Sequence, residues 1–209
     1  QFNFDVTEIE ITDNGNKFTG LNKGKITTDN GLIIEANTFE YDKKLNILKA
    51  SGKVKIDDKI KELIIYSDQI IYLKNEEKIF TYKNSKAVNN QGIIIDANNF
   101  EFNKILNILN ANGNVKIEDT KKDFIIYADD ITYLRNQEKI FTQGKTEAII
   151  ESKYNFKSKN VVLLRNKMLL SSNDNTDIID DKSQFFNSLG ILSAELSVNS
   201  KFSFFFTKW

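Results

Sequence analysis

Apolar and polar residues alternate in short stretches along most of the chain. In the first stretch, Phe2, Phe4 and Val6 fall on one face, and Ile9 and Ile11 follow. A period of two residues is typical of a half-buried β-strand. Similar stretches rich in Ile, Val, Phe and Tyr recur at spacings of about 8–12 residues, and none sustains a 3.6-residue period. The pattern therefore predicts an all-β protein with little or no helix.

A long internal repeat organises these predicted strands. Residues 92–142 repeat residues 31–81 without a gap, at an offset of 61 residues, and about 32 of the 51 aligned positions are identical. A partial unit precedes the first copy, and a diverged third copy starts at Glu147. One copy is too thin to enclose a core, so stacked copies must bury their apolar faces together. We expect an elongated, folded-over antiparallel sheet.

The repeats define one predicted domain and a tail. We predict repeats over about residues 31–91 and 92–146 inside a domain of residues 1–182, flanked by partial units. Residues 183–209 depart from the pattern and end in KFSFFFTKW. Three interpretations stay open for this tail: a poorly ordered end from a truncated or shifted frame, a final edge strand, or a barrel-insertion signal with a terminal aromatic residue.

Two glycines stand at the same point of both copies. Gly52 and its twin Gly113 interrupt a predicted strand. A glycine held inside a strand indicates a β-bulge or a close approach of another backbone segment. We therefore expect both strands to bend or to be approached closely at these residues.

The composition of the chain excludes most kinds of catalytic site. The chain has 29 basic and 29 acidic residues, so its balance disfavours nucleic-acid binding. It has no Cys and no His, which excludes disulfides, thiolate metal sites, cysteine nucleophiles and the commonest general base and metal ligand. We predict no enzyme activity, no catalytic residues, no metal site and no cofactor.

Structural turns are the favoured interpretation of the remaining carboxylate pairs. The first and last pairs lie in turn-like sequence, where Asp is favoured for its own side-chain hydrogen bonds, and the middle pair is not kept at its twin Asp68-Gln69. The alternatives are a carboxylate dyad or a calcium site. The pairs are Asp57-Asp58, Asp129-Asp130 and Asp180-Asp181.

No run of about 18 apolar residues exists, so we predict no transmembrane helix. The chain begins at Gln1 without Met and without a basic, apolar leader. These features favour a mature, exported protein whose signal peptide is absent from this chain.

With most kinds of catalytic and metal site excluded, the apolar interior is the main feature left that can support a function. An open sheet lined with aliphatic side chains can hold acyl chains by burial, at about 25 cal/mol per Å². The alternative is a closed core that fills itself. The aromatic positions Phe39, Tyr41, Tyr66 and Tyr72, with their twins, are interpreted mainly as core or strand-pair residues. A stacking platform for sugars is their possible second role.

Three segments of each copy resemble the OstA-like repeat of the lipopolysaccharide transport proteins. In the first copy they are residues 33–41, 46–56 and 64–72, with the pattern I-I-(E/D)-A-N-x-F-E-(Y/F), N-I-L-x-A-x-G-x-V-K-I and I-I-Y-x-D-x-I-x-Y. That family includes the bridge LptA, a domain of LptC and the N-terminal periplasmic domain of LptD. The resemblance covers about residues 2–170, and the chain is most similar to the LptD domain. It ends too soon for the LptD barrel, so we expect a fragment, a truncated product or a stand-alone paralogue.

The resemblance implies a β-jelly roll, or "β-taco", in the periplasm and associated with the outer membrane. Its expected partners are lipopolysaccharide, held in an apolar groove, and other Lpt-type β-jelly rolls joined by edge-strand pairing. The alternative is a structural β-repeat module that binds only proteins. The predicted groove residues are Ile34, Ala36, Phe39, Leu48, Val54, Ile56, Ile95, Ala97, Phe100, Leu109, Val115 and Ile117.

Overall fold

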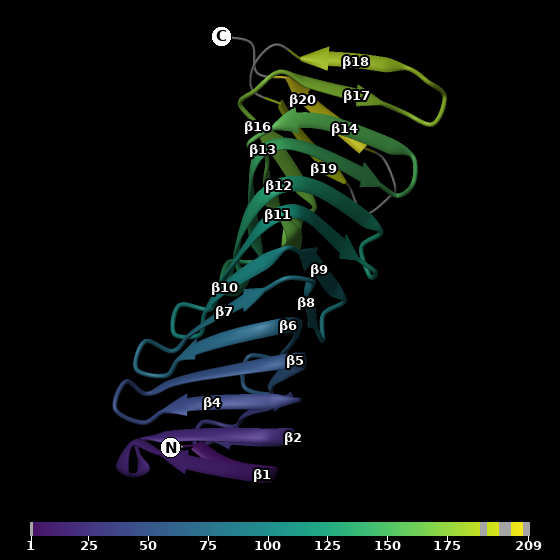
Figure 1. The fold of residues 1–209 in the computed structure, drawn as a ribbon. Helices are drawn as coiled ribbons and strands as arrows, with labels where there is room; N and C mark the ends of the chain where they lie inside the picture. The colour runs from purple at the N-terminus through teal and green to yellow at the C-terminus, as the bar shows by residue number, and fades with distance from the viewer. Residues whose placement is uncertain (1, 189–191, 197–201, 207–209) are drawn as a thin grey trace. The chain divides into compact units, whose positions relative to one another are not determined.

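The computed structural model describes residues 2–188, 192–196 and 202–206 (Figure 1). The described chain is built from antiparallel β-strands and three 3-10 segments of three residues each, which confirms the predicted all-β class. None of these helical segments has the length and apolar character that a helix needs to cross a membrane. Contacts divide the chain into unit 1, residues 1–107, and unit 2, residues 108–209.

Unit 1 holds the first ten strands. They are β1 (Phe2–Thr12), β2 (Lys17–Thr28), β3 (Leu32–Ala36), β4 (Thr38–Asp42), β5 (Ile47–Asp58), β6 (Leu63–Leu73), β7 (Lys78–Tyr82), β8 (Ser85–Asn89), β9 (Ile93–Ala97) and β10 (Asn99–Asn103). A 3-10 segment, η1 (Asp13–Gly15), joins β1 to β2.

Each long strand of unit 1 takes part in two rows of strand segments. β5 pairs with β4 through residues 47–51 and with β3 through residues 55–58. In the same way, β6 pairs with both β7 and β8, and β2 with both β4 and β3. We call the row that contains β3, β8 and β9 row A, and the row that contains β4, β7 and β10 row B. Consecutive rungs of both rows are visible in Figure 1.

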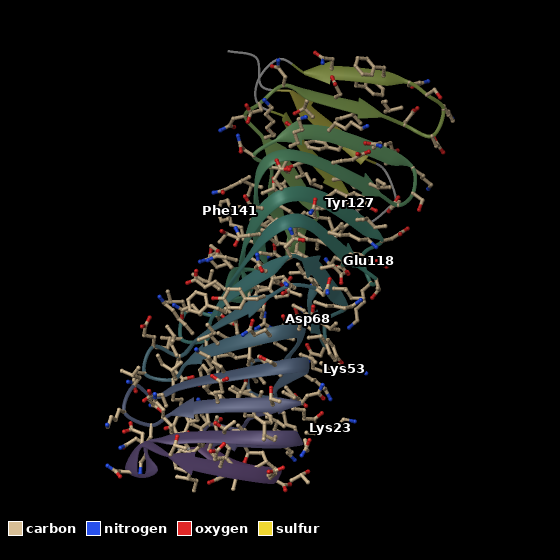
Figure 2. All side chains as sticks on the ribbon, in the orientation of Figure 1. Lys23, Lys53, Asp68, Glu118, Tyr127 and Phe141 are labelled. Atoms are coloured by element: carbon tan, nitrogen blue, oxygen red, sulfur yellow. The ribbon has the colours of Figure 1, made fainter. Side chains whose placement is uncertain are left out.

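The long strands bend between the two rows. In β5 the pairing with β6 shifts between Ser51 and Val54, a β-bulge in which Gly52 has φ +80°. The bulge predicted there is confirmed. A Cβ on Gly52 would lie 2.6 Å from Nδ2 of Asn37, so the group closest to that position is a side chain rather than a backbone segment. We call this line of bends the hinge. Figure 2 shows Lys23, Lys53 and Asp68 one above another along it.

The two rows of unit 1 fold onto each other. The ring of Phe2, in row A, lies 4.8 Å from that of Tyr41 and 6.0 Å from that of Tyr72, both in row B. The rows therefore enclose an apolar interior that is continuous at the hinge. We call the opposite margin the mouth. It is formed by turns such as 59–62 of row A and 104–107 of row B.

Unit 2 repeats this plan. Its strands are β11 (Ile108–Asp119), β12 (Phe124–Leu134), β13 (Lys139–Ile150), β14 (Tyr154–Lys159), β15 (Val162–Leu164), β16 (Leu169–Ser172), β17 (Thr176–Ile179), β18 (Phe185–Ser188), β19 (Leu192–Leu196) and β20 (Phe202–Phe206), with 3-10 segments η2 (Arg135–Gln137) and η3 (Arg165–Lys167). β13 pairs with β14 in row A and with β15 in row B. The register of β11 and β12 shifts between Asn112 and Val115, so the bulge predicted at the second glycine is also confirmed.

The described parts of the predicted tail are strands. β18 pairs with β17, β19 with β16, and β20 with β19, so these segments extend both rows of unit 2. Among the described residues, β18 and β20 pair with a strand on one side only, whereas β19 lies between β16 and β20. The poorly ordered end and the terminal aromatic residue concern residues 189–191, 197–201 and 207–209, which lie outside the described residues.

Candidate functional site

All twelve residues predicted for the groove are buried, with at most 9% of each residue exposed. Nine lie together in unit 1, whereas Leu109, Val115 and Ile117 belong to unit 2. At these positions the interior is filled by the protein's own side chains. An acyl chain would need the two rows to move apart before it could contact them.

The predicted aromatic positions divide into two groups. Phe39 and Tyr72 are buried in the interior. Tyr66 and its twin Tyr127 are 40% and 43% exposed, so these two are not core residues. Their side chains alternate outwards from the buried positions on either side of them in β6 and β12.

The interior of unit 1 comes to the surface at β1. The pairing register places Ile11, Phe18, Tyr41, Leu48 and Tyr72 in one line across row B. Leu48 and Tyr72 are fully buried, Phe18 and Tyr41 are half-buried, and Ile11 is 55% exposed. The strand predicted here is present. Its last apolar residues are exposed, contrary to expectation, because no strand of the described part of unit 1 lies beyond β1.

β1 is also an edge strand. It pairs with β2, and no strand of the described part of unit 1 lies on its other side (Figure 1). Phe4 stacks on Phe18 with ring centroids 5.8 Å apart, and Ile9, opposite Gly20 in the pairing with β2, is 44% exposed. A long edge with unpaired N–H and C=O groups is a template for another strand. Here that template borders exposed residues of the inner face.

A buried lysine closes the mouth of unit 1. Lys104 follows β10 in row B, and its Nζ lies 3.4 Å from Oδ2 of Asp58 at the end of β5 in row A. The same Nζ lies 3.2 Å from Oε2 of Glu77, in a turn of row B. The side chains of Lys104 and Asp58 are only 7% and 3% exposed. We call these three residues lock 1, because they tie the turns of the two rows together.

Neighbouring groups fix the charges of lock 1. Tyr72 donates a hydrogen bond to Oε2 of Glu77 (2.6 Å), and Lys74 donates one to Oε1 (2.5 Å). Asn30, in a turn of row A, donates to the same carboxylate at 3.2 Å. Burial alone would raise the pKa of Glu77, but the hydrogen bonds from Lys74 and Tyr72 and the charge of Lys104 outweigh it, so this pKa is lowered. Burial, then the hydrogen bond to Glu77, raises the pKa of Tyr72.

An arginine closes the mouth of unit 2 in the same way. Nε of Arg165 lies 2.5 Å from Oδ2 of Asp119, and Nη1 lies 3.2 Å from Oε1 of Glu138. The side chains of Arg165 and Asp119 are 5% and 0% exposed. Lys122 also donates a hydrogen bond to the carbonyl oxygen of Arg165, at 3.0 Å. We call Arg165, Asp119 and Glu138 lock 2.

The two locks are related by the sequence repeat. Each residue of lock 2 follows its counterpart in lock 1 by 61 residues: Asp58 and Asp119, Glu77 and Glu138, Lys104 and Arg165. In both locks the backbone N–H of the cationic residue also donates to the carbonyl of the Glu, at 2.9 Å. Sequence reasoning missed both locks. The signal that could have found them was the kept charge at the same offset, extended into the diverged third copy.

The acidic pairs have structural partners. Oδ1 of Asp58 accepts a hydrogen bond from N–H of Lys61 (3.0 Å), and Oδ1 of Asp180 accepts one from N–H of Gln184 (2.7 Å), as expected for turns. Asp130, of the pair that is not kept between copies, lies inside β12 and accepts a hydrogen bond from N–H of Gly113 (3.0 Å). In the part of the chain that the structure describes, no three acidic side chains gather as a metal site.

A cavity of about 300 Å³ lies at the mouth of unit 1, directly at lock 1. Its lining combines the lock with two exposed isoleucines. The lining residues are Asn30, Asp58, Ile60, Lys61, Glu77, Lys104 and Ile105.

The chain has a distant likeness to known proteins among solved structures. No protein family and no curated protein match the chain. Among solved structures, the chain is similar to the crystal structure of LptH from Pseudomonas aeruginosa, described as the LptA-homologous periplasmic component of the lipopolysaccharide transport device. The TM-score is 0.48 at 14% sequence identity, over 54% of this chain and 82% of that chain.

Proposed function

We propose that this chain is a carrier and docking module of lipopolysaccharide export. Lipid acyl chains would bind between rows A and B, and the edge of β1 would pair with another folded-over β-sheet. This role places the protein in the periplasm, associated with the outer membrane. Within the system, the resemblance of the first strand and of residues 149–170 favours the N-terminal domain of LptD.

The uncovered inner face beside the edge of β1 carries this proposal. A partner strand added to β1 would extend the sheet by main-chain hydrogen bonds. It would also cover Ile9, Ile11, Phe4 and Phe18, so the partner's apolar face would continue the interior of unit 1. An acyl chain moving from the interior of unit 1 to the apolar face of the partner would stay out of water, and burial would contribute about 0.8 kcal/mol per CH₂.

A photo-crosslinking amino acid at Phe39 or Phe100 tests lipid binding. Both residues are buried, at 1% and 2% exposure, so an inserted lipopolysaccharide chain should be captured there. The same crosslinker at Glu40, the exposed neighbour of Phe39 on the opposite face of β4, is the matched control. A folded variant that captures no lipopolysaccharide at Phe39 and Phe100 would contradict the proposal.

A second function is favoured by the filled interior. Because the predicted groove residues are buried, the chain could act as a β-repeat module that binds only proteins through its edges. That function predicts edge association that lipopolysaccharide leaves unchanged. Size-exclusion measurements with and without lipopolysaccharide, on the wild type and an Ile9→Lys/Ile11→Lys variant, distinguish the two functions.

A further inference from the structure

The mouth of unit 1 exposes large aliphatic side chains. Ile60 is 69% exposed, Ile105 68%, Leu106 57% and Leu45 61%, and all four lie in turns at the mouth. Aliphatic side chains in such positions gain nothing from the fold itself, because they contribute little burial. They form an apolar rim on both rows of unit 1.

The same positions are polar in unit 2. The residues 61 positions after Ile60, Ile105 and Leu106 are Lys121, Asn166 and Lys167. The rim is therefore a property of unit 1 alone, although both units share the same lock. Because unit 2 has the same plan without these aliphatic side chains, the fold itself does not require the rim.

Lysines accompany the exposed aliphatic residues. Lys59 and Lys61 flank Ile60 in its turn, and Lys43 and Lys44 precede Leu45. A surface on which aliphatic side chains lie next to cationic side chains suits the boundary between acyl chains and anionic headgroups. The rim therefore complements an anionic amphiphile rather than a polar protein surface.

Lock 1 is the barrier between this rim and the interior. The cavity of about 300 Å³ is lined by the exposed Ile60 and Ile105 and by the buried Lys104. Nζ of Lys104 lies 5.6 Å from the ring centroid of Tyr72, whose ring is fully buried in the interior. Opening the lysine's two ion pairs would connect the cavity with the enclosed side chains.

The aspartate of lock 1 is also less completely bonded than the aspartate of lock 2. The buried Oδ2 of Asp58 accepts no hydrogen bond from the described residues, and the ammonium of Lys104 stands 3.4 Å away. The corresponding oxygen of Asp119 accepts a direct hydrogen bond from Arg165 at 2.5 Å. A buried carboxylate oxygen without a hydrogen bond weakens the closed state, so lock 1 should open more readily.

We propose that the acyl chains of an anionic amphiphile pass into the interior between Ile60 and Ile105, through the mouth of unit 1, when lock 1 opens. The headgroup stays outside, beside Lys59. This inference rests on the proposed function, because it assigns the place and the order in which the lipid is loaded.

Two cysteine pairs test the route. The chain has no cysteine, so Ile60→Cys/Ile105→Cys can be joined by a cleavable bis-maleimide across the mouth of unit 1. The control joins Lys121→Cys and Asn166→Cys, the positions 61 residues later, across the mouth of unit 2. All four replaced side chains are exposed, and the folding of each variant is checked by circular dichroism before joining.

The readout is capture of lipopolysaccharide by a photo-crosslinker at Phe39. We expect joining across unit 1 to reduce capture at least tenfold, cleavage of the link to restore it, and the control pair to change it less than twofold. Unchanged capture in the joined unit 1 variant, or equal loss in both variants, would overturn the route while leaving lipid binding intact. No capture in the unjoined protein would overturn both proposals.

The headgroup contact has its own test. Lys59→Glu should slow capture of lipopolysaccharide severalfold, because a cation beside the rim becomes an anion. Capture of dodecyl maltoside, an uncharged amphiphile, should be unaffected in the same variant. Equal rates for lipopolysaccharide in the wild type and the variant would remove Lys59 from the route.

Discussion

Lock 1 and lock 2 have the same plan but use different cations. In unit 1 the single ammonium of Lys104 is shared between two carboxylates at 3.4 and 3.2 Å. In unit 2 the planar guanidinium of Arg165 reaches both carboxylates with separate N–H groups, one of them at 2.5 Å. A rigid fork of donors satisfies two carboxylates more completely than a point charge does. One fold can thus hold one mouth more tightly than the other through a single residue difference.

Removing the cation from each lock should have the largest effect on the stability of the two units. Arg165→Met leaves the fully buried Asp119 without its charge partner, and we expect a loss of about 3–5 kcal/mol in the stability of unit 2. Lys104→Met should cost less, because one oxygen of Asp58 already lacks a hydrogen bond. Urea unfolding followed by hydrogen exchange within each unit measures both losses, with Asn166→Ala as the exposed control. A larger loss for Lys104→Met would reverse our ranking of the locks.

The hinge offers a second contrast between the units. Gly144 has φ +77°, and a Cβ there would lie 2.1 Å from Oδ2 of Asp129, which accepts a hydrogen bond from N–H of Lys145. Gly144→Ala should therefore destabilise unit 2 by about 1–3 kcal/mol. The twin position holds Lys83, a side chain that already tolerates φ 65°, so Lys83→Ala should be nearly neutral. Thermal unfolding of both variants checks this, and equal effects would show that the clash relaxes at little cost.

Exchanging the two cations tests whether the donor geometry sets the stability of each lock. Lys104→Arg gives Asp58 and Glu77 a forked donor, and we expect unit 1 to gain about 0.5–1 kcal/mol. Arg165→Lys should cost unit 2 a similar or slightly larger amount. Hydrogen exchange at the mouth turns of each unit reports these changes. Losses in both variants would mean that the surrounding packing, rather than the donor geometry, selects each cation.

Acid should weaken lock 1 through Glu77. The pKa of this carboxyl is lowered on folding from its usual 4.5, so its stabilisation is fully present above about pH 4.5 and is lost as the pH falls through the folded value. Exchange protection of the turn 74–77 should therefore decrease when the pH is lowered from 6 to 3.5. Glu77→Gln should remove this dependence. A variant that keeps the full pH dependence would assign the titration to another carboxylate.

The all-β fold followed from the sequence, because a period of two and a repeat without gaps report local geometry. Gly52 signalled its bulge for the same reason. The locks could not be found that way. Asp58 and Lys104 are 46 residues apart, and they meet because turns of opposite rows face each other across the mouth. Ile60 and Ile105 likewise carry no local signal that one cavity unites them.

The offset of 61 residues also sets the length that one copy adds to the folded sheet. In unit 1 the first full copy contributes four rungs to each row, from β3 through β8, and adjacent strands are about 4.8 Å apart. One copy therefore adds about 19 Å of enclosed apolar path, together with one bulged hinge segment and one charged closure. Proteins that gain or lose whole copies would change their reach in steps of this size. They would do so without redesigning a single contact, because every added residue meets neighbours that the preceding copy already provides.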